Sequence, residues 1–125
     1  MVLKTSSQRV LIADDERVIA DTLALIFNRK GFEARAVYSG EQAVEAAMTL
    51  NPDVLISDVV MGEMSGIEAA ALIQGSAPSC RVILISGQAS TADLLSHAKS
   101  EGQVFEILSK PVHPQILLEL LDSSC

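Results

Sequence analysis

The 125-residue sequence predicts a three-layer α/β fold, with helices on both faces of a five-stranded parallel sheet. Short runs that are apolar throughout, such as Val10–Ala13 and Val82–Ile85, are typical of strands buried on both faces. Stretches with apolar residues at helical spacing separate these runs, so strands and helices alternate. No internal repeat or linker is visible. We therefore expect one domain over residues 1–125, with a core at about 9–121 and no attached output domain.

The first strand, Val10–Ala13, leads into a predicted helix that three acids open and that runs to about Lys30. Acidic side chains at a helix start suit the helix dipole, and Gly31 is the expected C-cap. Helical spacing predicts the buried side of this helix as Val18, Ile19, Leu23, Ile26 and Phe27.

The second strand, Phe32–Val37, is more polar, which suits a position near a sheet edge. Ser39 and Gln42 have capping-box spacing for a helix to about Leu50, and Pro52 prevents its continuation. Its buried side is predicted to use Ala43, Val44, Ala47 and Met48.

The remaining elements follow the same alternation. Val54–Asp58 is the central strand, and Ser65 or Gly66 begins a short helix over Ile67–Gln74. After the strand Val82–Ile85, a polar helix is expected from Ser90 or Thr91 to about Ser100, followed by a strand over Val104–Leu108. Pro114 suits the first position of a last helix. The buried side of that helix is predicted as Ile116, Leu117, Leu120 and Leu121.

Polar side chains follow four of the predicted strands. Asp14 and Asp15 follow the first strand, Asp58 ends the central strand, Ser86 ends the fourth, and Lys110 follows the fifth. The carboxyl ends of parallel strands meet at one edge of the sheet, where α/β folds bind ligands. We therefore expect these five side chains to converge on one acidic, metal-binding pocket around Asp58.

Composition excludes several other classes of protein. A net charge of −7 argues against nucleic acid and against an anionic membrane surface as partners. No apolar run approaches the roughly 20 residues of a membrane span. Cys80 and Cys125 lack metal-ligand or disulfide spacing, which favours a reducing cytoplasm. His97 and His113 have no partner at ligand or triad spacing and are interpreted as surface residues.

The order and strand-end placement of several short motifs resemble one family. These motifs are Asp14-Asp15, Asp58, the Met61…Met64…Gly66 loop, Ser86-Gly87 and Lys110-Pro111. With them the sequence resembles the receiver domain of two-component response regulators, similar to chemotaxis regulators. The resemblance implies a flavodoxin-like sheet of order 2-1-3-4-5. It also implies phosphoryl transfer onto an aspartate from a sensor histidine kinase or a histidine phosphotransfer protein.

The resemblance also implies a role for each matching residue. Asp58 would be the phosphoacceptor. Asp15 and Asp58 would bind Mg²⁺ (or Mn²⁺) directly, Asp14 would bind it through water, and Val60 would bind it through its backbone carbonyl. The Lys110 ammonium, the Ser86 hydroxyl and the backbone N–H groups of Val60 and Gly87 would hold the transferred phosphoryl group.

Two positions depart from the family pattern. Gly62 stands where the family loop commonly has proline, and Ile107 stands where many receivers carry a switch tyrosine or phenylalanine. Phe105 shares a strand face with Ile107 and is expected to join it and Ser86 in switching. The side chains that flank the hydrolytic water would be Val60 and Gln88, which are two residues after Asp58 and Ser86 respectively.

The expected function is a signalling domain that catalyses only its own phosphorylation and dephosphorylation. A downstream protein would contact the face formed by the fourth helix, fifth strand and fifth helix. One alternative is a small aspartyl-phosphate phosphohydrolase, but the position of its usual second acid is held by Val60. A flavin-binding module would need a phosphate loop where Asp14 and Asp15 stand. A binding module without phosphorylation would not need all five key residues.

Overall fold

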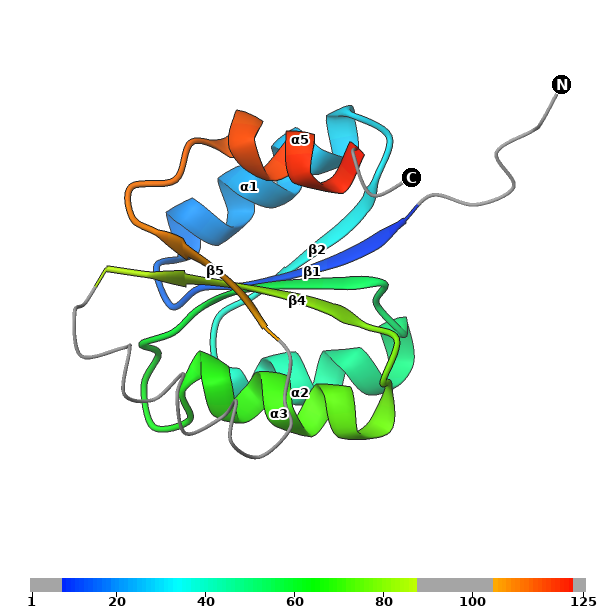
Figure 1. The fold of residues 1–125 in the computed structure, drawn as a ribbon, viewed down its shortest axis with the longest axis vertical. Helices are drawn as coiled ribbons and strands as arrows, with labels where there is room; N and C mark the ends of the chain where they lie inside the picture. Colours follow the sequence, from blue (N-terminus) through cyan, green and yellow to red (C-terminus); the bar gives the residue numbers. More distant parts are fainter. Residues whose placement is uncertain (1–7, 88–104, 123–125) are drawn as a thin grey trace, which may run out of the picture.

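A computed structural model describes residues 8–87 and 105–122, in which five parallel strands lie between two helical layers (Figure 1). The strands are β1 (Arg9–Ala13), β2 (Glu33–Val37), β3 (Val54–Asp58), β4 (Arg81–Ser86) and β5 (Glu106–Ser109). Their order in the sheet is β2-β1-β3-β4-β5, which confirms the expected topology. The helices are α1 (Arg17–Arg29), α2 (Gly40–Leu50), α3 (Gly66–Ser76) and α5 (Pro114–Asp122). The helix predicted over residues 90–100 lies outside the described residues.

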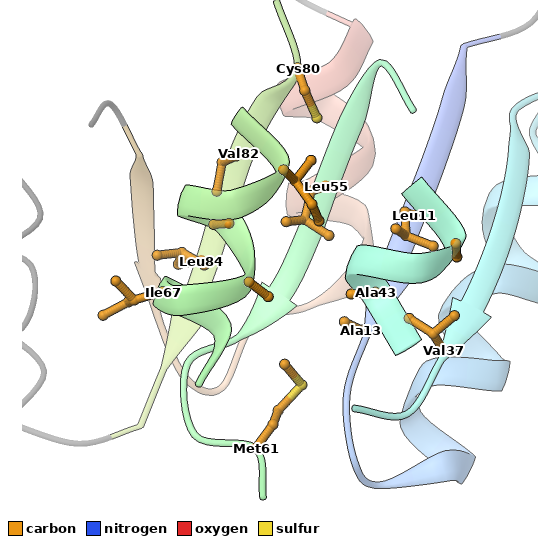
Figure 2. Packing of buried hydrophobic residues seen from close by; sticks show 14 of the residues in the cluster. Leu11, Ala13, Val37, Ala43, Leu55, Met61, Ile67, Cys80, Val82 and Leu84 are labelled. Carbon is orange, nitrogen blue, oxygen red and sulfur yellow. The ribbon is translucent and has the colours of Figure 1, made fainter. Parts of the chain in front are cut away.

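The sheet separates two hydrophobic cores, because successive side chains of a strand point to opposite faces. One core lies against α2 and α3 and includes Leu11, Leu55 and Leu84 (Figure 2). The other core, on the α1 and α5 side, includes Ile12 and Ile56. This two-sided burial explains why the central strands read as unbroken apolar runs.

The buried faces of the helices differ in part from the prediction. In α1, Ala20, Leu23, Ala24 and Phe27 are buried. Val18 and Ile19, predicted to be buried, are 78% and 40% exposed. Burying Ala20 and Ala24 puts small side chains against the sheet and turns Val18 toward solvent.

The same error occurs in two other helices. Gly40, Ala43 and Ala46 form the buried side of α2, and the predicted Met48 is 75% exposed. In α5 the predicted Ile116 is 46% exposed, and Leu118 is buried with Leu117 and Leu121. In α2 and α1, small residues occupy contact positions that a search for bulky apolar side chains overlooks.

The helix termini largely follow the local signals. Ser65 caps α3 in a reciprocal capping box with Glu68, and Pro114 is the first residue of α5. The Ser39 hydroxyl accepts a hydrogen bond from the Gln42 backbone N–H, as expected for a cap. The Gln42 side chain, however, accepts from the Tyr38 N–H, so the second half of the predicted capping box is replaced.

Two smaller features complete the fold. The Cys80 side chain is buried in the core beside α3, where burial raises the pKa of its thiol to about 11. Among residues 8–87 and 105–122, no helix combines the length and apolarity needed to cross a bilayer.

The Arg81 side chain on β4 links this strand to β5 by an ion pair and to α5 by a hydrogen bond. The Arg81 Nη2 atom donates to Glu106 Oε1 at 2.8 Å, and its Nη1 atom donates to the Leu120 carbonyl at 3.1 Å. The Arg81 hydrogen bond holds the pKa of the Glu106 carboxyl below its usual range. This contribution to stability is therefore present above the ordinary glutamate pKa and is lost as pH falls through the lowered one.

Arg81→Gln is expected to lower the free energy of unfolding by about 1 kcal/mol at neutral pH, since the pair is partly solvated. Urea denaturation of both proteins at neutral pH and at about pH 3 measures this effect. The difference between them should shrink at the lower pH, and a pH-independent difference would rule out a stabilising role for the ion pair.

Candidate functional site

Three carboxylates meet at the carboxyl edge of β1 and β3. Ala13 is in register with Ser57, so the residues that follow each strand come side by side. One oxygen each from Asp14, Asp15 and Asp58 lies within 4.8 Å of the other two. Asp14 and Asp58 are buried and Asp15 is exposed, so the cluster opens to solvent at Asp15.

Lys110 lies against this cluster from the other half of the sheet. Its Nζ atom donates to Asp58 Oδ2 at 3.0 Å, and its backbone N–H donates to the Ser86 carbonyl at 2.8 Å. The pairing of Ser86 with Ser109 brings the ends of β4 and β5 together at this point. Gly87 leaves room for the lysine, since a Cβ there would lie 3.3 Å from the Lys110 Cδ.

The charges of the cluster oppose one another. Burial raises the pKa of the Asp14 carboxyl, the Glu16 N–H hydrogen bond lowers it, and the charge of Asp58 raises it further. Burial lowers the pKa of Lys110, but the hydrogen bond and charge of Asp58, with the charges of Asp14 and Glu16, together hold this pKa above its ordinary value. Three carboxylates thus share one protonated amine, and a divalent cation would relieve the remaining repulsion.

The donor set fits Mg²⁺ or Mn²⁺. All three side chains offer hard oxygen ligands, which Mg²⁺ prefers at about 2.0–2.1 Å. Two such oxygens on opposite sides of the ion are about 4.2 Å apart, close to the spacing of the cluster. Asp15 stands on the open side, where metal-bound waters would be exposed.

The loop between β3 and α3 carries Val60, which follows Asp58 by two residues and is 50% exposed. Figure 2 shows Met61 pointing from this loop toward α2 and α3, where it is buried in the core. Gly62 adopts a φ of +41°, in the left-handed region that favours glycine. The loop therefore makes its turn with a glycine at the position where the family pattern has proline.

Two further predicted site residues lie beside or on β5. Phe105 lies just before β5 and packs, half-buried, on the core beside α2 and α3. Ile107 is 42% exposed on β5. Gln88 lies outside the described residues.

The structure also has a cavity of about 420 Å³ that the sequence did not indicate. Asp14, Glu16 and Lys110 line one part of it, and the rest is mostly apolar. The apolar lining includes Val18, Ile19 and Leu23 of α1, Ile85 of β4, and Pro111, Val112, Pro114 and Leu117. The only hint in the sequence was the apolar character of Val18 and Ile19, which the helical pattern assigned to the core.

Comparison with known proteins identifies the family. Residues 10–122 match the model of the response regulator receiver domain. The chain is 32% identical over 116 residues to the chemotaxis protein CheY of Thermotoga maritima, covering 92% of this chain and 95% of that protein. It is 24% identical to the DNA-binding response regulator MtrA of Mycobacterium tuberculosis, covering 93% of this chain. The chain spans 50% of the length of MtrA.

A solved structure has the same fold. The CheY-like receiver domain protein of Methanospirillum hungatei superposes with a TM-score of 0.84 at 24% identity, covering 95% of this chain and 94% of that one. The match of residues 10–122 to the family model, supported by 32% identity to a full-length relative, shows that the chain belongs to the response regulator receiver domain family.

Proposed function

We propose that the chain is a phosphoacceptor in a two-component phosphorelay and that Asp58 accepts the phosphoryl group. One observation carries the proposal: a buried carboxylate ends the central strand, with an ammonium nitrogen 3.0 Å from one of its oxygens and oxygens of two other carboxylates within 4.8 Å. The donor would be the phosphohistidine of a sensor histidine kinase or a phosphotransfer protein.

The reaction requires little covalent chemistry from the chain. An Asp58 carboxylate oxygen forms a bond to phosphorus while the phosphorus–nitrogen bond of the donor breaks, and the electron pair leaves with the imidazole. Such transfers depend mainly on in-line positioning and on neutralising charge on the equatorial oxygens. Lys110 supplies a fixed positive charge, and the Ser86 hydroxyl and the Val60 and Gly87 N–H groups would donate hydrogen bonds.

Asp14, Asp15, Asp58 and the Val60 carbonyl would hold the metal ion, Mg²⁺ or Mn²⁺. When bound, the metal would supply positive charge in addition to that of Lys110. Two residues would govern hydrolysis of the product: Val60 crowds the approach of water to the phosphoryl group, and Gln88 orients that water.

Output would pass to a downstream protein through the fourth helix, β5 and α5. Exposed apolar side chains on two of these elements, Ile107 and Ile116, support this surface. Ser86, Phe105 and Ile107 would link it to the phosphorylation site, and the setting would be the cytoplasm.

The test is an intact-mass measurement after incubation with acetyl phosphate, with and without Mg²⁺. The proposal expects one phosphate-sized adduct that needs the metal and is lost in base, as an acyl phosphate is. No adduct with either acetyl phosphate or phosphoramidate would overturn it.

The cavity beside α1 leads to a prediction about the protein donor. Val18 is 78% exposed and lines the cavity next to Asp14 and Lys110, so a donor reaching Asp58 from this side would contact it. Val18→Gln adds polarity without charge. We expect it to slow transfer from a phosphorylated histidine protein about tenfold and to leave labelling by acetyl phosphate unchanged.

The matched control is Leu72→Gln, which changes a 54% exposed leucine on α3, on the opposite face of the sheet. It should transfer at the wild-type rate from both donors. Equal rates for Val18→Gln and wild type with the protein donor would remove α1 from the docking surface.

A further inference from the structure

Ser57 lies one residue before Asp58, and its side chain is fully buried, with 0% exposure. Neighbouring side chains of a strand point to opposite faces, so Ser57 faces the layer of α2 and α3 while Asp58 faces away from it. The closeness of Ser57 to Gly66, the first residue of α3, agrees with this placement. Nothing proposed above for phosphoryl transfer uses this hydroxyl.

The hydroxyl holds the backbone of the acceptor. Ser57 Oγ donates to the carbonyl oxygen of Asp58 at 2.9 Å. Gly66 closes the same space, because a Cβ added there would lie 2.0 Å from that carbonyl oxygen and 2.8 Å from Ser57 Oγ. The Asp58 carbonyl is thus confined between a hydroxyl and the backbone of α3.

Both backbone polar groups of Val59 are also held. The Val59 N–H donates to the Ile85 carbonyl at 3.1 Å, and the Val59 carbonyl accepts from the Gly66 N–H at 2.8 Å. The Asp58–Val59 peptide unit therefore has its carbonyl fixed by Ser57 and its N–H fixed by β4. A rotation of this peptide unit would displace the Asp58 carboxylate. It would also displace the carbonyl of Val60, which follows Asp58 by two residues.

We propose that Ser57 is a positioning residue for Asp58, acting from the opposite face of the sheet. The inference rests on the proposed function. Its physical basis is that phosphoryl transfer depends on alignment, and displacements of about 1 Å at a reacting group can cost up to 100-fold in rate. A hydroxyl that merely satisfies its own buried hydrogen bond would affect stability and not the rate.

The experiment compares Ser57→Ala with wild type at saturating acetyl phosphate and Mg²⁺, well below both melting temperatures. Labelling of Asp58, followed by intact mass, should be about tenfold slower in Ser57→Ala, since the acceptor peptide loses its fixed orientation. A tenfold change equals about 1.4 kcal/mol of barrier, which one hydrogen bond can supply.

Ile73→Val is the control for lost stability. Ile73 of α3 is buried in the core on the face of the sheet that Ser57 faces, and the substitution costs about 0.5–1.5 kcal/mol. It should be labelled at the wild-type rate. If Ser57→Ala does not fold, Ser57→Cys replaces it; the thiol is a weaker donor, and slower labelling is again expected.

The outcomes separate the two proposals. A wild type that is not labelled at Asp58 contradicts the proposed function. A labelled wild type with Ser57→Ala at the same rate overturns only the positioning role, as does an equal slowing in Ile73→Val. Slow labelling confined to the Ser57 variants supports it.

Discussion

Asp58→Asn is expected to abolish the phosphate adduct while the protein stays folded. The substitution keeps the shape of the side chain. It leaves an amide oxygen that can still accept the hydrogen bond from Lys110, which is 3.0 Å long in the wild type. An amide is a poor nucleophile toward phosphorus, so the rate should fall below detection. Loss of one of three mutually repelling charges should also make the metal-free variant no less stable than wild type.

Intact mass after incubation with acetyl phosphate and Mg²⁺ measures the adduct, and thermal unfolding verifies the fold. Asp53→Asn is the matched control, because Asp53 is an exposed aspartate immediately before the same strand. Within the described part of the chain, its side chain accepts a hydrogen bond only from the Arg9 backbone N–H. It should be labelled as wild type is. Undiminished labelling of Asp58→Asn would place the principal acceptor elsewhere.

The second large effect concerns the metal. Mg²⁺ should raise the melting temperature of the wild type, since a ligand at 100 times its Kd stabilises the folded state by about 2.7 kcal/mol. Asp15→Ala removes the carboxylate on the open side of the cluster and is expected to weaken Mg²⁺ binding about 100-fold. Without metal, the variant should be at least as stable as wild type, because one repelling charge has gone.

Calorimetric titration with Mg²⁺ gives the affinity, and melting curves with and without the metal give the stabilities. Glu45→Ala, an exposed acid on α2 outside the cluster, serves as the control and should bind like wild type. An affinity for Mg²⁺ that is the same in Asp15→Ala and wild type would exclude Asp15 as a ligand.

The position of the site was predictable because strand ends are fixed by pairing. Once β1 and β3 are adjacent and in register, Asp15 and Asp58 must lie at the same edge, whatever the helices do. Unbroken apolar runs identified the central strands, and their order came from the resemblance of the motifs. The prediction therefore depended on backbone geometry, which sequence patterns report well.

The packing of helices was less predictable, because it depends on small residues. Ala20 and Ala24 set how α1 lies on the sheet, and this leaves Val18 and Ile19 beside a cavity. Ser57 gave no signal at all, since a serine in an apolar run has no pattern of its own. Its proposed role emerges only from the structure, in which Gly66 lies close to the same Asp58 carbonyl that accepts the Ser57 hydrogen bond.

The two halves of the site belong to parts of the sheet that differ in protection against local opening. Asp58 ends β3, which is buried at every residue and paired on both sides. Lys110 follows β5, an edge strand of four residues that are all partly or fully exposed. Opening of an edge strand breaks one ladder, whereas opening of β3 breaks two, so amide hydrogens of β5 should exchange faster than those of β3. We therefore expect the Lys110 ammonium to separate from Asp58 more often than the acidic cluster itself opens.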